Sequence, residues 1–484
     1  MVFSSHLFMF YFLPLALVVY YVLPRRGKHL ALTVLSYGFY GWANPLFMVL
    51  MLASTAVDYF CGLVISGARP WGREPIGQLA AGGPRRRTQK VALAVSICSN
   101  LALLGFFKYF NFSLANYNAA AAALGMQGLN LDLAFKVTLP LGISFYTFQS
   151  MSYSIDVYRG GARAVRSFID FACYVSMFPQ LVAGPIIRFA EVADQLQQRT
   201  HTLEKFARGA AFVSLGLAKK VLLANPCGKV ADLAFGAASV SAPDAWYGAA
   251  AYAFQIYFDF SAYSDMAIGM GLMLGFVFPK NFDSPYLAGS ITEFWRRWHM
   301  SLSSWLRDYL YIPLGGSRKG RARTYANIAV VMLLGGLWHG AAWNFVIWGG
   351  MHAALLMAER VAGKRSLYHR LPRPGRIAVT FVILLFTWVF FRADSLPAAL
   401  AYCGSMLGLA PAGESARLLA GVMYQPYYLG TFAIAAVVAW AAPQTWDFTR
   451  RLTAPRAVAV LAALAAALIV LATQAYNPFI YFIF

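Results

Sequence analysis

Long apolar runs recur along the whole chain, and they constrain its fold more than any other feature. Hydrophobic residues make up 60% of the 484 residues and charged residues only 12%, whereas an average soluble domain carries about 25% charged residues. Runs long enough to cross about 30 Å of hydrocarbon lie near residues 7–23, 30–66, 91–110, 136–157, 168–187, 206–224, 245–278, 325–343, 345–361, 377–392, 427–442 and 457–474. The sequence therefore predicts an all-α, polytopic membrane protein with roughly 11–13 transmembrane helices.

The polar segments between these runs are short. The longest are 67–90, 188–205 and 312–324, each too short to bury a core of its own. We therefore expect residues 1–484 to form a single membrane domain. The halves of the chain show no matching pair of broken helices, which disfavours many transporter folds.

Basic residues give the chain a net charge of +21, but they are not gathered into one stripe. They form short clusters between the apolar runs, a pattern that indicates membrane topology rather than nucleic-acid binding. The first run lacks a basic segment before it and is followed by Arg25, Arg26 and Lys28, so we expect a retained helix rather than a signal peptide. By the positive-inside rule these clusters face the cytoplasm, which places the N-terminus on the opposite side of the membrane.

Two stretches are expected to depart from simple spans. The run at 30–66 is interrupted at Trp42-Ala43-Asn44-Pro45. In 139–161, Pro140 and Gly142 precede a run dotted with polar residues, which favours a broken or re-entrant helix beside a cavity.

Residues 290–310 are predicted to form one amphipathic helix in the membrane interface. Ser290 and Glu293 have capping-box spacing, and an apolar face is separated from a polar one. The apolar face comprises Phe294, Trp298, Leu302, Trp305 and Tyr309, and the polar face comprises Arg296, Ser303, Ser304 and Arg307. His299 falls at the border of the two faces.

Three of the seven histidines, His299, His339 and His352, lie between residues 294 and 352. A histidine in a membrane protein is costly unless it is satisfied, so each is either a functional group or a hydrogen-bonding partner of a neighbouring helix. His339 is our first choice as a general base because flanking glycines, Gly335, Gly336 and Gly340, permit close approach of a ligand or of another backbone. His352 is interpreted as structural.

Other chemistries have weaker support. His339 and His352 are thirteen positions apart, which is not the i, i+4 spacing of a helical metal pair, so we expect no metal site. No G-x-S-x-G string marks a serine nucleophile. The five cysteines are scattered without C-x-x-C spacing and receive no role.

Two carboxylates, Asp259 and Asp265, lie inside the apolar run at 245–278. A carboxylate at such a depth needs a partner, and Gln255, Ser261 and Tyr263 stand close enough along a helix to supply hydrogen bonds. We expect both aspartates to line the site, with packing against an arginine or a backbone donor as the structural alternative.

Ordered strings along nearly the whole chain resemble the membrane-bound O-acyltransferase (MBOAT) superfamily, in its bacterial branch of polysaccharide O-acetyltransferases. These strings are MVFSSHLFMFYFLPL, PLGISFYTFQSMSYSIDVYRG, MFPQLVAGPIIRF, QIYFDFSAYSDMAIGMG, NFDSPYLAGSITEFWRRWHMSLSSWLRDYLYIPLGGSR and LWHGAAWNF. The resemblance implies tilted helices around a central funnel or tunnel, with the catalytic core at about 136–361. It also implies that His339 is the essential catalytic histidine and His299 the second one.

The resemblance further implies transfer of an acetyl group to an exported polysaccharide such as alginate or cellulose. No cofactor is expected to be permanently bound; acetyl-CoA is the expected donor, and a periplasmic acetyltransferase, the polysaccharide and membrane lipids are the expected partners. The cluster from Arg318 to Arg323 is either a site for the phosphates of CoA or a plain topology signal.

An imidazole with a pKa of about 6.5 suits proton removal from the attacking hydroxyl. The residues expected to line the site and assist there are Trp338, Trp343, Asn344, Trp298 and Ser303. Two other functions stay open: D-alanyl transfer to teichoic acids by the same fold, and non-catalytic acyl or lipid transport.

Overall fold

In a computed structural model of the protein, the chain folds into helices joined by irregular segments. The structure describes residues 2–480 apart from 43, 70–71, 73, 133–134, 183, 364–369, 410–413 and 475, and none of these described residues forms a strand. The all-α prediction is confirmed. The chain divides into two compact units, Met1–Phe206 with Met270–Phe278, and Ala207–Gly269 with Pro279–Phe484.

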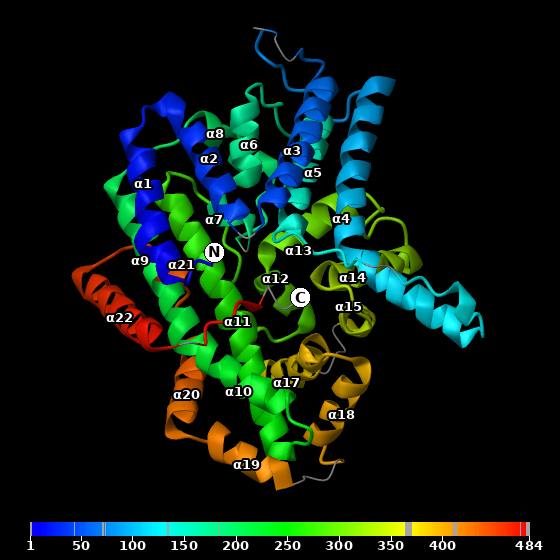
Figure 1. Ribbon diagram of the computed structural model, residues 1–484, viewed down its shortest axis with the longest axis vertical. Helices are drawn as coiled ribbons and strands as arrows, with labels where there is room; N and C mark the ends of the chain where they lie inside the picture. Colours follow the sequence, from blue (N-terminus) through cyan, green and yellow to red (C-terminus); the bar gives the residue numbers. More distant parts are fainter. Residues whose placement is uncertain are drawn as a thin grey trace. The chain divides into compact units, whose positions relative to one another are not determined.

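The first unit consists of helices from the N-terminal part of the chain (Figure 1). They are η1 (Leu7–Phe12), α1 (Leu13–Val22), η2 (Arg25–Gly27), α2 (Lys28–Gly41), α3 (Pro45–Ser66), α4 (Arg87–Ala123), η3 (Gln127–Leu129), α5 (Ile143–Arg159), α6 (Phe168–Ser176), α7 (Phe178–Leu181), α8 (Phe189–Gln197) and the start of α9 (Leu203–Ala218). The predicted interruption of the run at 30–66 is confirmed, because α2 and α3 are separate helices. Asn44 ends the interruption by accepting a hydrogen bond from the N–H of Leu46 at 3.0 Å, and Pro45 follows at the first helical position.

The predicted break near Pro140 is also observed. Gly142 has a φ of +74° and directly precedes α5, and a Cβ at this position would meet the carbonyl oxygen of Leu181. A side chain is excluded there both by the left-handed backbone and by the neighbouring segment. Whether α5 is re-entrant stays a prediction.

The second unit contains the rest of the helices. They are η4 (Lys219–Ala224), α10 (Asn225–Phe235), α11 (Ala242–Met273), η5 (Pro285–Leu287), α12 (Ile291–Arg297), α13 (Met300–Leu306), η6 (Arg307–Tyr311), α14 (Arg321–His339), α15 (Trp343–Ala362), α17 (Arg373–Arg392), α18 (Leu396–Met406), α19 (Glu414–Met423), α20 (Pro426–Trp440), α21 (Thr445–Phe448) and α22 (Ala454–Thr473). Its core is a cluster of buried aromatic and aliphatic side chains around α11, including Tyr257, Trp298, Trp348 and Trp388.

Glycines bring α14 and α15 into close contact within this unit. A Cβ on Gly336 would clash with the carbonyl oxygen of Phe345, and a Cβ on Gly349 would clash with the carbonyl oxygen of Met332. Small residues allow the two backbones to approach in this way. Glycines near His339 permit close approach of a ligand or of another backbone, and the structure shows the approach of another backbone.

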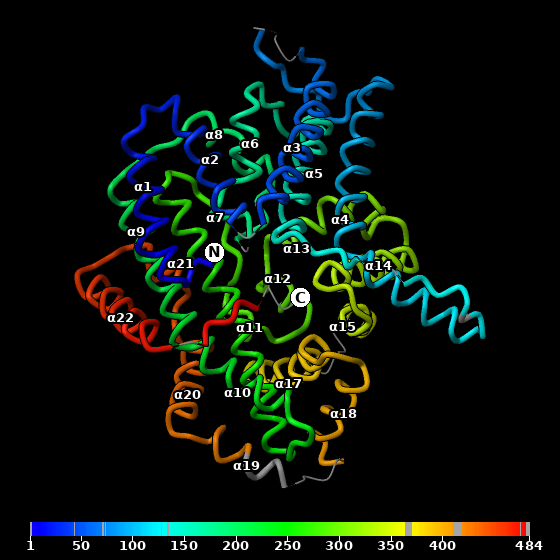
Figure 2. Tube along the Cα trace, in the orientation of Figure 1, coloured from blue at the N-terminus to red at the C-terminus, as the bar shows by residue number. Residues whose placement is uncertain are grey.

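Four helices among the described residues are long and apolar enough to cross a membrane, namely α3, α4, α17 and α22. The chain is thus a polytopic membrane protein, as predicted, while the number of spans, the funnel and the single-domain organisation stay predictions. Beyond α22, the C-terminal segment turns back along α11, as Figure 2 shows in red and green.

Candidate functional site

The segment 290–310 is two short helices, so the prediction of one continuous helix is wrong. Helix α12 ends at Arg297 and α13 begins at Met300. His299 stands between them with a φ of +42°, a left-handed conformation that is uncommon for a residue other than glycine. The direction of the histidine ring is therefore set by this left-handed residue and not by its position on a continuous helix.

Burial of the segment follows the predicted faces even though the helix is broken. Phe294, Trp298, Leu302 and Trp305 are buried, whereas Arg296 and Arg307 are exposed. The predicted cap is formed in part, because the Ser290 hydroxyl accepts a hydrogen bond from the N–H of Glu293 at 3.1 Å.

Asn281 holds the turn that carries His299. Its side-chain oxygen accepts hydrogen bonds from the backbone N–H of Ser301 at 3.2 Å and from the Ser301 hydroxyl at 2.8 Å. The same oxygen lies 3.3 Å from Nδ1 of His299, and the Asn281 carbonyl accepts a hydrogen bond from the N–H of Met300 at 2.9 Å. The strained residue is therefore fixed by several polar contacts, as expected at functional sites.

His299 is fully buried, and its Nε2 has no hydrogen-bond partner among the residues that the structure describes. Burial penalises the imidazolium, and the neighbouring charge of His339 adds to this penalty, so the pKa of His299 lies well below its usual range. His299 is consequently a neutral imidazole around pH 7. A neutral ring with a free nitrogen is equipped to exchange a hydrogen bond with a reacting group.

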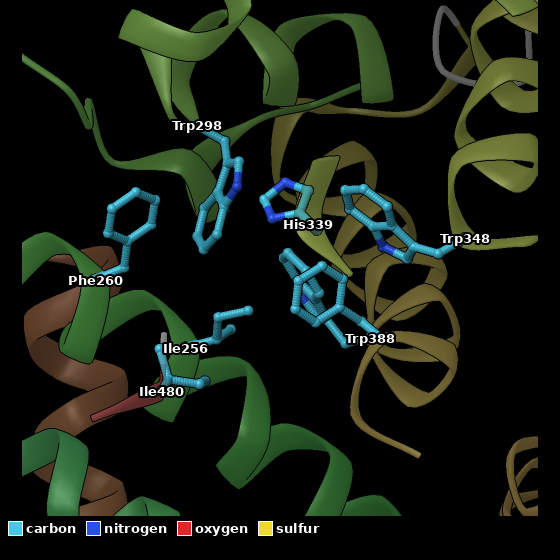
Figure 3. Close-up of a pocket in the computed structure, with 8 residues that line it drawn as sticks. Ile256, Phe260, Trp298, His339, Trp348, Trp388 and Ile480 are labelled. Carbon is cyan, nitrogen blue, oxygen red and sulfur yellow. The ribbon is translucent and has the colours of Figure 1, made fainter. Parts of the chain in front are cut away.

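His339 is the last residue of α14 and lines a cavity in the second unit. The cavity lining is aromatic and aliphatic apart from this histidine, and comprises Ile256, Phe260, Trp298, His339, Trp348, Trp388, Phe391 and Ile480. In Figure 3 the His339 ring lies between Trp298 and Trp348, while Ile256 and Ile480 lie together on another side of the cavity. One titratable group thus faces an apolar space.

The free space in this cavity is small. The volume open to the centres of water molecules is about 10 Å³, which corresponds to about one water molecule. Aromatic rings enclose the histidine closely, since the centroids of Trp348 and Phe391 lie 5.3 Å and 5.2 Å from that of His339. The geometry favours chemistry from which bulk water is excluded.

The ring of Trp338 contacts the rings of both His299 and His339. Its ring centroid lies 6.0 Å from that of His299 and 5.0 Å from that of His339. The structure therefore brings together His299, His339, Trp298 and Trp338, four of the residues predicted for the site.

The two predicted aspartates belong to ion pairs instead of being held by their own helix neighbours. Oδ1 of Asp259 lies 2.9 Å from Nζ of Lys220, with each side chain 1% exposed, and Oδ2 accepts a hydrogen bond from the N–H of Ile480 at 2.9 Å. Asp265 pairs with Lys219 at 2.7 Å and accepts a hydrogen bond from Thr445. The structural alternative is thus observed for Asp259, which has a backbone donor, while lysines rather than an arginine supply the opposite charges. Asp259 is linked to the cavity through Ile480, whereas Asp265 contacts none of its lining residues through these bonds.

Of the predicted residues, only His339 and Trp298 belong to the described lining of the cavity; His299 and Trp338 lie next to it through their ring contacts, and the others lie outside the lining. The Asn344 amide donates a hydrogen bond to the carbonyl oxygen of Ala393, and the Ser303 hydroxyl lies 3.5 Å from the carbonyl oxygen of Trp298. Trp343 is 56% exposed. Their roles in catalysis stay predictions. His352 fits its structural interpretation, since its Nδ1 accepts a hydrogen bond from Nε1 of Trp295 at 3.2 Å.

Sequence reasoning missed much of the apolar wall. Ile256, Phe260, Trp348, Trp388, Phe391 and Ile480 were not singled out, although all line the cavity. Trp348 and Trp388 are the strongest sequence signals, because large aromatic residues in the apolar runs that follow the glycine-rich histidine motif are suited to enclosing it. Nothing local distinguishes Ile480 from the many other isoleucines.

Comparisons with known proteins are consistent along the whole chain. Residues 161–393 match MBOAT, the membrane-bound O-acyltransferase family. The chain is 42% identical to a probable alginate O-acetylase of Pseudomonas putida, covering 100% of both chains. It is 35% identical to a peptidoglycan O-acetyltransferase of Helicobacter pylori over 84% of this chain and 80% of the relative. A teichoic acid D-alanyltransferase of Streptococcus thermophilus is 30% identical over only 44% of this chain and 54% of the relative.

Proposed function

Since the chain belongs to the membrane-bound O-acyltransferase family, in its alginate-type O-acetyltransferase branch, we propose that it acetylates hydroxyl groups of an exported polysaccharide. The acetyl donor is acetyl-CoA, taken from the cytoplasm. The acetyl group passes across the bacterial inner membrane and reaches the polymer directly or through a periplasmic acetyltransferase. The relatives that cover most of the chain act, by name, on alginate and peptidoglycan, and both names support a polysaccharide acceptor.

The observation that carries the proposal is the position of His339 at the C-terminal end of α14, facing a small apolar cavity. In acyl transfer, the acceptor oxygen attacks the thioester carbonyl and its proton passes to the imidazole of His339. The C–O bond forms, the C–S bond breaks, and the thiolate leaves and takes up the proton. The C-terminal end of a helix favours positive charge, so it stabilises the imidazolium that forms midway.

His299 has a different task because its surroundings keep it neutral. Its buried Nε2 accepts or donates no hydrogen bond within the described part of the chain, and a neutral imidazole that carries its proton on this nitrogen donates a hydrogen bond to the developing oxyanion. The Asn281 oxygen at 3.3 Å from Nδ1 fixes the ring. Two histidines in unlike environments thus take the separate roles of base and electrostatic assistant.

A larger cavity in the same unit supports an anionic donor. It has a volume of about 760 Å³, and four arginines contribute to its lining, namely Arg296, Arg307, Arg360 and Arg376. Two carboxylates also line it, but Glu293 pairs with Arg297, and Glu359 accepts hydrogen bonds from the N–H groups of Ile291 and Thr292. Guanidinium groups bind phosphate oxygens in a bidentate manner, so we assign the phosphates of CoA to this cavity. Arg296 and Arg307 belong to the same segment as His299, which links donor binding to the reaction site.

Replacement of His339 by alanine tests the proposal. General-base assistance contributes about 10²- to 10⁴-fold to the rate, so we expect His339→Ala to lower acetylation of the polymer by this factor. Acetyl content is measured by mass spectrometry of the isolated polymer, and the amount of inserted protein by quantitative blotting of membranes. His6→Ala is the matched control, because His6 is exposed in the first unit. Normal acetylation by His339→Ala protein that is inserted normally would overturn the proposal.

Mass spectrometry of the polymer and a measurement of released CoA separate the two other functions. A D-alanyl group on the polymer has a different mass from an acetyl group and would identify a D-alanyltransferase. A passive transporter would not release free CoA from acetyl-CoA in an acceptor-dependent manner, whereas the proposed enzyme does.

A further inference from the structure

The C-terminal segment is held firmly inside the second unit. Nζ of Lys220 donates a hydrogen bond to the carbonyl oxygen of Pro478, and Oδ2 of Asp259 accepts one from the N–H of Ile480. The ring of Phe479 stacks on Tyr263 with centroids 3.9 Å apart. The buried Lys220–Asp259 ion pair therefore anchors this segment by one hydrogen bond on each side of Phe479.

This anchoring inserts one side chain into the reaction cavity. Ile480 is 2% exposed and lines the same cavity as His339. It lies beside Ile256 of α11, and the two form an aliphatic wall away from the histidine (Figure 3). A residue more than a hundred positions from His339 in the sequence thus closes the space in which His339 acts.

The space left by this wall has the size of the smallest acyl substituent. It admits about one water molecule, with a volume of about 10 Å³, and a methyl group is only slightly larger than a water molecule. The methyl group of an acetyl thioester fits with small adjustments. A propionyl or butyryl group carries further carbons that would collide with Ile480 or Ile256.

We propose that Ile480 is a specificity-determining residue that restricts the enzyme to a two-carbon acyl group. This inference rests on the proposed function. One additional methylene group in an apolar pocket changes specificity by about 10- to 200-fold. Removal of most of the Ile480 side chain therefore shifts the preference between acyl donors by a factor of this order.

The test is a competition between acetyl-CoA and propionyl-CoA in membranes that contain the full-length protein and its acceptor polymer. The ratio of propionyl to acetyl groups on the polymer is measured by mass spectrometry. We expect Ile480→Ala to raise this ratio at least about 10-fold, and Ile256→Ala to raise it as well. Ile480→Val, which removes a single carbon, is expected to give a smaller increase and is available if the alanine variant does not fold.

Ile469→Ala is the matched control, because Ile469 is 67% exposed on α22; its ratio is expected to stay that of the wild type. Equal loss of both products in Ile480→Ala and Ile480→Val, with an unchanged ratio, would overturn the inference and assign Ile480 a purely structural role. Failure of the proposed function gives a different result, since the wild-type protein would then not consume acetyl-CoA at all.

Discussion

Lys220→Met is expected to destabilise the protein strongly by breaking its most deeply buried ion pair. The 2.9 Å contact joins two side chains that are each 1% exposed, and removal of one partner from such a pair costs about 3–5 kcal/mol because the other charge stays buried. Methionine keeps the length of the lysine stem, so little packing is lost. Two groups lose their partner, the Asp259 carboxylate and the Pro478 carbonyl. We therefore expect a value near the middle of this range, about 4 kcal/mol.

The assay is unfolding in mixed micelles with increasing SDS, followed by the fluorescence of the 12 tryptophans. A double-mutant cycle with Asp259→Asn isolates the pair, since asparagine still offers an oxygen to the N–H of Ile480. We expect a coupling energy of about 2–3 kcal/mol, the upper part of the range for residues in contact. Arg307→Gln is the control, because Arg307 pairs with Asp308 but is 60% exposed, and such pairs contribute about 0–1 kcal/mol.

Two outcomes would refute this reasoning. A cost for Lys220→Met no larger than that of Arg307→Gln would mean that water reaches the pair. Strict additivity of the two single substitutions would mean that the charges do not interact, and the C-terminal segment would then be held by its apolar contacts alone.

Two further expectations follow from packing and from protonation. Gly336→Ala is expected to destabilise the α14–α15 pair by about 1–3 kcal/mol, because the added Cβ would meet a backbone carbonyl. Gly335→Ala is the control and is expected to be neutral or stabilising, because its Cβ would only reach a leucine methyl at 3.6 Å. Equal effects of the two substitutions in the same SDS titration would contradict this expectation. Burial and the charge of His339 lower the pKa of His299 in the folded state, so the unfolded state binds more protons below about pH 6.5. The free energy of unfolding therefore falls as the pH decreases through this value, by up to about 1.4 kcal/mol per pH unit. His299→Asn, which tolerates a left-handed backbone, should flatten the pH dependence measured between pH 7 and 5; an unchanged slope would show that His299 is not the group responsible.

The features that the sequence predicts well are those with a local physical cause. The apolar runs predict a helical membrane protein because hydrocarbon offers the backbone no other partner. The string Trp42-Ala43-Asn44-Pro45 predicts an interruption, and Pro140 and Gly142 predict a break, because proline and glycine act directly on the adjacent backbone. Four of the five residues on the predicted apolar face of 290–310 are buried and Tyr309 is half-buried, since burial follows hydrophobicity whether or not the helix is continuous.

The features that escape prediction depend on residues far apart in the sequence. No pattern around His299 indicates a left-handed backbone, because its cause is Asn281, eighteen positions earlier. Asp259 was assigned neighbours on its own helix, whereas its charge is balanced by Lys220 and its second oxygen by Ile480, 221 positions later. A hydrogen bond satisfied across the fold outcompetes a local one because it also fixes two elements together.

The same division explains why the chemical groups of the site were found and its shape was not. Histidines are scarce and costly in an apolar chain, so His339 and His299 stand out, whereas an isoleucine in a chain that is 60% hydrophobic carries no signal. Yet in the proposed mechanism the apolar wall of the cavity is as necessary for acyl transfer as the base. A thioester beside an imidazole is hydrolysed wherever water has access, and a cavity with room for about one water molecule has none left once a methyl group occupies it. Selection of the acetyl group and protection of its thioester from water thus have one physical origin, the packing of Ile256 and Ile480 against the space that His339 faces.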